Sequence, residues 1–87
     1  MAYIYILQSE KTKNYYIGSS QNFEKRYKEH LAGRVRSTKA LLPLKVVLKQ
    51  SLPDIDIAKK LELRLKKFKR RDFIEKIVKD GKVKSYI

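Results

Sequence analysis

Two short runs near the start of the chain, Tyr3-Ile4-Tyr5-Ile6-Leu7 and Asn14-Tyr15-Tyr16-Ile17-Gly18-Ser19, decide how the rest of the sequence is interpreted. Both runs are rich in aromatic and β-branched residues, which favour strands. A polar stretch over residues 8–13 separates them. This pattern predicts two antiparallel strands, over residues 2–8 and 14–20, joined by a turn.

The tyrosines of this hairpin are its main chemical feature. Because side chains alternate between the two faces of a strand, Tyr5 and Tyr16 share a face, and a suitable register places them side by side. Gly18 on that face adds no side chain, and a glycine inside a strand often marks close approach by a ligand or another backbone. Strand tyrosines usually only pack. A phenol becomes a base only where a cation or a hydrogen bond stabilises its phenolate.

Length and composition favour a small globular protein. The 87 residues are enough for one domain, residues 1–87, with one hydrophobic core. The chain has no Cys, which excludes disulfides and thiolate metal sites. No apolar run approaches the roughly 20 residues of a membrane span, and Met1-Ala2-Tyr3 begins a strand rather than a signal peptide. We therefore expect a cytoplasmic protein that does not contact a membrane.

The charge predicts the kind of partner. There are 22 Lys and Arg against 9 Asp and Glu, a formal net charge of +13. Such an excess favours a polyanion, because each neutralised phosphate releases counterions. We expect nucleic acid; a basic protein bound to a ribosome or a membrane surface is the alternative. The candidate nucleic-acid contacts are Gly18, Arg34, Arg36, Lys39, Lys59, Lys66, Lys67, Lys69, Arg70 and Arg71.

A helix is predicted directly after the hairpin. Asn22 can cap a helix over residues 23–32, which Gly33 ends. Phe23, Tyr27 and Leu31 repeat every fourth residue and are its expected buried stripe. Residues 33–43 are predicted as a basic loop suited to phosphate contacts.

Arg26 and His30 stand one turn apart on that helix, at the expected margin between the core and solvent. A lone His on a helix is usually structural. The neighbouring Arg26 strengthens a functional interpretation, because a guanidinium fork matches the oxygens of a phosphate.

The second half of the chain predicts a strand over residues 44–50 and two helices. Asp54 or Asp56 caps the first helix, whose core-facing stripe is Ile57, Leu61, Leu65 and Phe68. The next helix covers residues 71–79 and carries Phe73, Ile77 and Val78. Residues 83–87 are predicted as an edge strand or a loose tail.

Glu62 stands one position off the core-facing stripe. A carboxylate suits a hard divalent cation such as Mg²⁺. The alternative is an ion pair with Lys66, one turn further on, and the residues alone favour that pair.

The motifs, taken in order, resemble the GIY-YIG nuclease superfamily. Tyr3-Ile4-Tyr5 and Tyr16-Ile17-Gly18 are followed by Arg26, His30 and Glu62. More narrowly, the chain is similar to the small single-domain bacterial members related to the N-terminal nuclease domain of the excinuclease of excision repair. Residues 21–30 resemble the first-helix motif of that group, and residues 61–68 resemble its Glu-bearing helix. The first motif departs from the pattern because its glycine is replaced, and Leu31 stands where Asn is frequent.

The resemblance implies an α/β (α+β) fold with a small three-stranded antiparallel sheet flanked by helices. It also implies an endonuclease that hydrolyses nucleic-acid phosphodiesters, with DNA expected and a role in repair or recombination, using one divalent metal, Mg²⁺ or Mn²⁺. By position, Tyr5 would be the general base or its partner, and Tyr16 would align water and phosphate. Arg26 would hold the scissile phosphate, and His30 would assist proton transfer or orient Tyr5. Glu62 would bind the metal.

Two other functions remain open at this point. One is a basic nucleic-acid-binding module that keeps the fold without catalysis. The other is a protein-interaction adaptor with Phe68 and Tyr86 as anchors. With one domain, target recognition would come from a protein partner.

Overall fold

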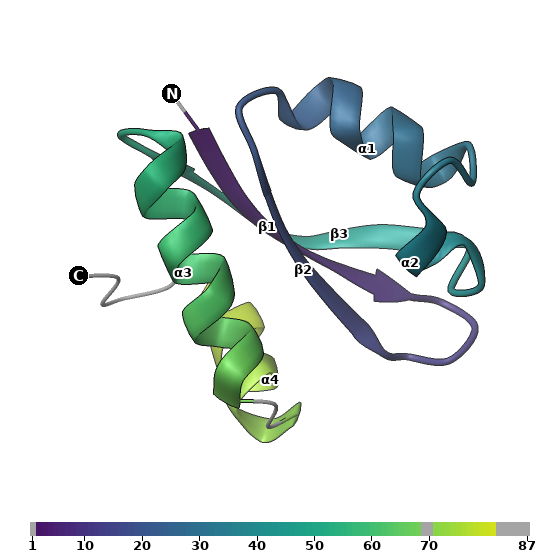
Figure 1. Ribbon diagram of the computed structural model, residues 1–87. Helices are drawn as coiled ribbons and strands as arrows, with labels where there is room; N and C mark the ends of the chain where they lie inside the picture. Colours follow the sequence, from purple (N-terminus) through teal and green to yellow (C-terminus); the bar gives the residue numbers. More distant parts are fainter. Residues whose placement is uncertain (1, 69–70, 82–87) are drawn as a thin grey trace.

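The computed structural model describes residues 2–68 and 71–81. Within these ranges the strands are β1 (Ala2–Ser9), β2 (Tyr15–Ser20) and β3 (Leu44–Leu52). The helices are α1 (Phe23–Leu31), α2 (Arg36–Lys39), α3 (Ile55–Phe68) and α4 (Arg71–Asp80). The strands form one antiparallel sheet in the order β2-β1-β3 (Figure 1). The predicted α+β fold with a three-stranded sheet is confirmed.

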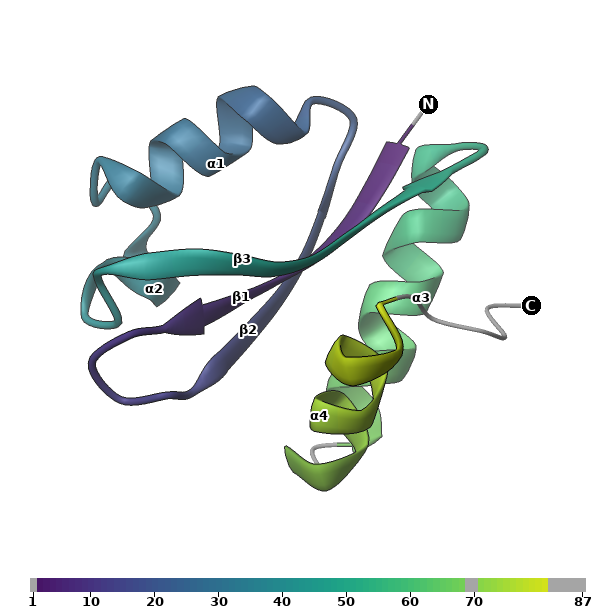
Figure 2. The ribbon, with the colours of Figure 1, turned by 180° about the vertical axis from the view of Figure 1, so that it is seen from behind.

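Helices cover both faces of the sheet. Figures 1 and 2 show α1 and α2 on one face and α3 and α4 on the other. The face toward α3 and α4 buries Ile4, Ile6 and Ile17 against Leu61 and other apolar side chains of the two helices. None of the helices in the described part of the chain has the length and apolar character needed to cross a membrane.

The opposite face of the sheet holds the aromatic residues. Tyr5 and Leu7 of β1 pack there against Phe23 of α1 and Leu44 of β3, with Tyr16 partly buried beside them. The strict alternation along β1 therefore separates an aliphatic layer from an aromatic one, as the sequence predicts.

The register of the hairpin differs from the expected one. Tyr5 is paired with Gly18, and Tyr16 is paired with Leu7, so the two tyrosines share a face but stand two residues apart. The turn sets this register, because Ser9 donates its N–H to Asn14 O at 2.9 Å and its carbonyl accepts from Lys13 N at 2.9 Å.

Pairing with Gly18 lets the tip of the Tyr5 ring lie over β2. A Cβ built on Gly18 would stand 2.5 Å from both Cζ and the hydroxyl oxygen of Tyr5. The close approach predicted at Gly18 is therefore made by a ring of the protein itself.

Helix α1 buries a different stripe from the one expected. Asn22 caps it as predicted, with its side-chain oxygen accepting from Lys25 N at 3.1 Å. His30 is fully buried, whereas Leu31 is 46% exposed. Seven residues make nearly two turns, so His30 lies almost directly below Phe23, and Leu31 is turned away from that line. The predicted positions of His30 at the margin and of Leu31 in the core are both wrong.

The segment expected as a basic loop, residues 33–43, contains the short helix α2. Val35 caps its start, and Thr38 and Lys39 donate their N–H groups to the Val35 carbonyl at 3.1 and 3.0 Å. Val35 and Thr38 are buried, while Arg36 and Lys39 are exposed. This segment is consequently anchored by apolar contact and one buried hydroxyl.

The C-terminal helices follow the prediction closely. Asp54 caps α3, accepting from Ile57 N at 2.9 Å. In α3, Ala58, Leu61 and Leu65 are buried. In α4 the buried pair is Ile74 and Ile77, and Phe73 is 36% exposed. The predictions for the Phe68 side chain, Lys69, Arg70 and residues 83–87 lie outside what the structure describes.

The contact between Gly18 and Tyr5 predicts a measurable cost of adding one methyl group. Gly18→Ala is expected to lower the free energy of unfolding in urea by about 1–3 kcal/mol, because the buried Tyr5 ring must move to admit the Cβ.

A double-mutant cycle gives the control. In a Tyr5→Leu background the ring is absent, so Gly18→Ala should cost clearly less there than in the wild-type protein. Equal costs in the two backgrounds would show that the ring contact does not explain why residue 18 is a glycine.

Candidate active site

A cavity of about 370 Å³ opens beside β2, and Tyr5, Tyr16, Arg26 and Glu62 line it. These residues come from β1, β2, α1 and α3. The cavity is completed by Gly18, Ser19, Lys59 and Leu63. The structure therefore brings together four of the five residues for which the sequence suggests a catalytic or metal-binding role.

The position of β2 at the edge of the sheet explains how residues from both faces meet. Among the described residues, β2 pairs only with β1. Tyr5 and Tyr16 approach the cavity from the face that α1 covers, and Glu62 approaches from the face that α3 covers. Gly18, which has no side chain, lets the tip of the buried Tyr5 ring lie against β2 and line the cavity at this edge.

His30, the fifth predicted residue, lies behind Tyr5. Its Nε2 is 3.1 Å from the Tyr5 hydroxyl, and its ring meets the rings of Tyr5 and Tyr16 edge-on at centroid distances of 5.8 and 5.2 Å. His30 is fully buried and does not line the cavity, so its hydrogen bond to the cavity runs through Tyr5.

A buried threonine extends this contact into a chain of three side chains. Nδ1 of His30 is 2.8 Å from Oγ1 of Thr38, and that hydroxyl donates to the Val35 carbonyl at 3.4 Å. A hydroxyl has a single proton, so Thr38 accepts from Nδ1–H of His30. Nε2 is then the acceptor for the Tyr5 hydroxyl. The tautomer of His30 follows from this network.

Burial keeps both members of the Tyr5–His30 pair neutral. It raises the pKa of Tyr5 to about 12, assisted by the nearby Tyr16 and opposed by the Arg26 guanidinium. Burial also lowers the pKa of His30, and the Arg26 charge lowers it further while Glu29 opposes. At neutral pH a neutral phenol therefore donates to a neutral imidazole. Tyr5 becomes a phenolate only as its proton passes to His30 or as positive charge is added beside it.

Arg26 lines the cavity and forms an ion pair within its own helix. Its Nη1 is 3.3 Å from Oε1 of Glu29, one turn further on in α1, and both side chains are partly exposed. Such exposed pairs contribute about 0–1 kcal/mol, so a phosphate can compete for the guanidinium. The planar guanidinium also matches a pair of phosphate oxygens.

Glu62 makes the ion pair that the sequence favoured, and its carboxylate also lines the cavity. Lys66 donates to its Oε2 at 2.6 Å, which is the expected ion pair. Ser19 donates to Oε1 from the neighbouring strand, and the carboxylate still lines the cavity. The ion pair is confirmed, and it lies within reach of the tyrosines.

The donor set fits a divalent ion that arrives with a substrate. The carboxylate of Glu62 and the hydroxyl of Ser19 are hard oxygen donors, and Mg²⁺ commonly uses one or two carboxylates together with waters and substrate phosphates. No group of three or more His, Cys, Asp or Glu side chains gathers within residues 2–68 and 71–81. An ion here would depend on Glu62 and on oxygens from outside the protein.

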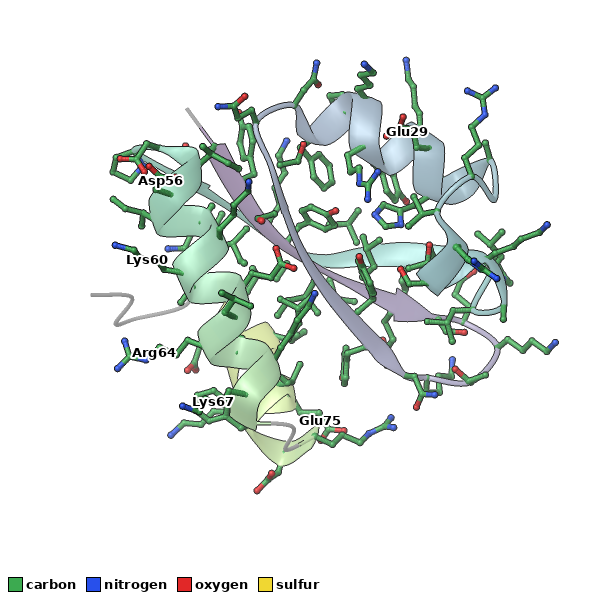
Figure 3. All side chains as sticks on the ribbon, in the orientation of Figure 1. Glu29, Asp56, Lys60, Arg64, Lys67 and Glu75 are labelled. Atoms are coloured by element: carbon green, nitrogen blue, oxygen red, sulfur yellow. The ribbon has the colours of Figure 1, made fainter. Side chains whose placement is uncertain are left out.

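The candidate nucleic-acid contacts are distributed over the surface. Gly18 and Lys59 line the cavity, and Lys66 stands at its border through the Glu62 pair. Lys67 projects from the outer side of α3, together with Lys60 and Arg64 (Figure 3). Arg34, Arg36 and Lys39 lie around α2, away from the residues that line the cavity. Arg71 lies on α4, and Lys69 and Arg70 are not described. Nucleic-acid contact at these positions stays a prediction.

Sequence reasoning missed Ser19 and Thr38. Strand alternation places Ser19 on the face of the sheet opposite Tyr16. Had α3 been assigned to that face, the alternation would have indicated that Ser19 lies near Glu62. Thr38 gave no signal, because the helix α2 that carries it has only four residues, too few to show a helical pattern in the sequence.

Comparison with known proteins identifies the relatives of this fold. The family described as GIY-YIG catalytic domain matches residues 1–77. A solved structure, the solution NMR structure of the UPF0213 protein BH0048 from Bacillus halodurans, matches 93% of this chain and 87% of its own. The two sequences are 25% identical, and the TM-score is 0.58. A comparison with curated proteins finds no match.

The hydrogen-bond chain predicts the state of the single histidine. Nitrogen-15 NMR of the ring should show the proton on Nδ1 and none on Nε2 at neutral pH, and the pKa from a pH titration should lie below the ordinary value of about 6.5. A proton on Nε2 in the folded protein would contradict the chain.

Two substitutions of Thr38 separate the hydroxyl from the packing. Thr38→Val keeps the shape but removes the acceptor for Nδ1–H, so the ring nitrogen shifts should move away from those of a pure Nδ1–H tautomer. Thr38→Ser keeps the hydroxyl and should preserve the wild-type shifts. Identical spectra for the wild-type protein and both variants would show that the Thr38 hydroxyl does not determine the tautomer of His30.

Proposed function

The chain belongs to the GIY-YIG family, and on that basis we propose that it is a divalent-metal-dependent endonuclease that hydrolyses nucleic-acid phosphodiester bonds. The observation that carries the proposal is that Tyr5, Tyr16, Arg26 and Glu62 line the same cavity, with His30 hydrogen-bonded to Tyr5 behind it. We propose that residues 1–87 act as one nuclease domain.

In the proposed reaction a water molecule attacks the phosphorus atom from the side of Tyr5. As the new P–O bond forms, the water gives a proton to the Tyr5 oxygen, and the Tyr5 proton passes to Nε2 of His30. The bond to the leaving oxygen breaks, and that oxygen takes up a proton from solvent. The imidazolium formed on His30 keeps its Nδ1–H bond to Thr38 and later releases its extra proton.

This route agrees with the raised pKa of Tyr5. A free phenolate would be costly in such a buried place, whereas exchange of one proton for another leaves the phenol neutral throughout. His30 is the acceptor because its own lowered pKa keeps Nε2 unprotonated before the reaction.

Arg26 and Tyr16 are proposed to position the phosphate. The guanidinium of Arg26 would hold two of its oxygens and stabilise the negative charge that grows on them in the transition state. The Tyr16 hydroxyl, two residues along the strand from the partner of Tyr5, would align the phosphate and the attacking water.

Glu62, next to the Ser19 hydroxyl, is the proposed anchor for Mg²⁺ or Mn²⁺. When bound, such an ion stabilises charge on the phosphate and the leaving oxygen as a Lewis acid. Binding at Glu62 competes with the Lys66 contact.

We propose DNA as the nucleic acid, a role in repair or recombination, and a cytoplasmic location. The net charge of +13 supports a polyanionic partner. A protein partner is proposed to supply target recognition.

One observation favours a second candidate function, a nucleic-acid-binding module without catalysis. Both oxygens of Glu62 accept hydrogen bonds from the protein, from Ser19 and Lys66. If these contacts persist when nucleic acid binds, no ion is held and the charged surface only binds the strand.

A matched pair of tyrosine variants tests catalysis. Tyr5→Phe is expected to slow cleavage of a labelled DNA in Mn²⁺ by about 100-fold or more, because it removes the group that exchanges the proton. Tyr3→Phe, in the same strand and with its ring against Phe23, should cleave within about twofold of wild type. Equal rates for Tyr5→Phe and wild type, with equal DNA binding, would favour the non-catalytic module.

A further inference from the structure

A second cavity, of about 460 Å³, lies against β2 next to the candidate active site. Tyr15 and Tyr16 of β2 contribute to it, and its other walls come from Leu65 and Lys66 of α3 and from Arg71 and Ile74 of α4. We call this cavity the edge groove. Nothing in the proposed mechanism uses it.

The edge groove adjoins the site through two shared residues. Tyr16 lines both cavities. Lys66 lines the edge groove, and its ammonium group contacts Glu62 of the site at 2.6 Å. A strand that placed one phosphate in the site would bring a neighbouring nucleotide close to the edge groove.

The walls of the edge groove combine apolar surface with cations. Leu65 and Ile74 form an apolar floor. The Arg71 guanidinium stands 5.6 Å from the centre of the Tyr15 ring, and the Lys66 ammonium stands 5.5 Å from that of Tyr16. Aromatic rings, an apolar floor and positive charge are the components with which proteins bind the base and the phosphate of an unpaired nucleotide. A purely electrostatic phosphate contact would need no apolar floor.

We propose that the edge groove binds the base of a nucleotide next to the scissile phosphate, which makes it a binding site for unpaired nucleotides. This inference rests on the proposed function and adds a substrate class to it. A base inside a duplex is stacked on both faces and paired at its edge, so it enters such a groove only after unstacking, at a cost of a few kcal/mol. The preferred substrate is therefore a strand with at least one unpaired nucleotide beside the cut.

The test compares two strands of equal charge. One is an oligothymidylate of about ten nucleotides, and the other has the same length and phosphates but abasic sugars throughout. Binding is measured by fluorescence anisotropy in EDTA, so that cleavage plays no part. The wild-type protein is expected to bind the strand with bases at least about fivefold more tightly, as one stacked base contributes about 1–3 kcal/mol.

Two variants with the same change of charge test whether the preference for the strand with bases arises in the edge groove. Arg71→Ala removes the cation at Tyr15 and should bring the ratio of the two affinities toward one. Lys60→Ala removes a cation from the outer side of α3 and should weaken both strands alike, leaving the ratio unchanged (Figure 3). Because Arg71 also contacts Glu75 and the Lys13 carbonyl, thermal unfolding of Arg71→Ala is measured to confirm that it folds.

The outcomes separate this proposal from the proposed function. Equal affinity of the wild-type protein for the two strands, or a preference that Arg71→Ala leaves intact, overturns base binding in the edge groove while nucleic-acid binding stands. The edge groove would then take another ligand, such as a peptide. If wild type binds neither strand, base binding in the edge groove also fails, and the proposed function is then decided separately by the cleavage assay with Tyr5→Phe.

Discussion

The ring of Tyr5 lies over Gly18, in the space that a side chain at residue 18 would need, and the candidate site depends on this contact. Tyr5 belongs to the central strand, so its hydroxyl would normally be shielded from the edge by a side chain of β2. The missing side chain at Gly18 lets the phenol reach the edge of the sheet. There it shares a cavity with Glu62, which approaches from the opposite face.

The site also requires a hydrogen-bond partner for the buried hydroxyl of Tyr5. Tyr5, His30 and Thr38 are each no more than 1% exposed, and unpaired polar groups there would cost several kcal/mol. The chain from Tyr5 through His30 to Thr38 and the Val35 carbonyl pairs every one of them. Among the described residues, no buried side-chain nitrogen or oxygen lacks a hydrogen-bond partner. The same bonds that stabilise the aromatic layer give the phenol a proton acceptor with a defined tautomer.

Local rules predicted the three strands, the helices α1, α3 and α4, and the caps of α1 and α3, because these depend on neighbours in sequence, whereas the short helix α2 was expected as a loop. Strand alternation placed Tyr5 and Tyr16 on one face, and Asn22 and Asp54 cap helices as expected. The register of the hairpin could not be predicted, because the turn after Ser9 sets it through backbone bonds. A hydrophobic stripe also cannot predict a buried His. The polar ring of His30 can be buried only because other parts of the chain supply its hydrogen-bond partners.

The central claim is that the edge of β2 is a hydrolytic site that needs the charge of Glu62. The most direct test is single-turnover cleavage of one labelled DNA by wild type and Glu62→Gln, purified side by side, with Mn²⁺ and saturating protein. Gln keeps the size of the side chain and still accepts from Ser19, but it removes the negative charge that an ion requires. We predict unchanged DNA binding and cleavage slower by about 100-fold or more. Equal cleavage rates for the two proteins would contradict the account.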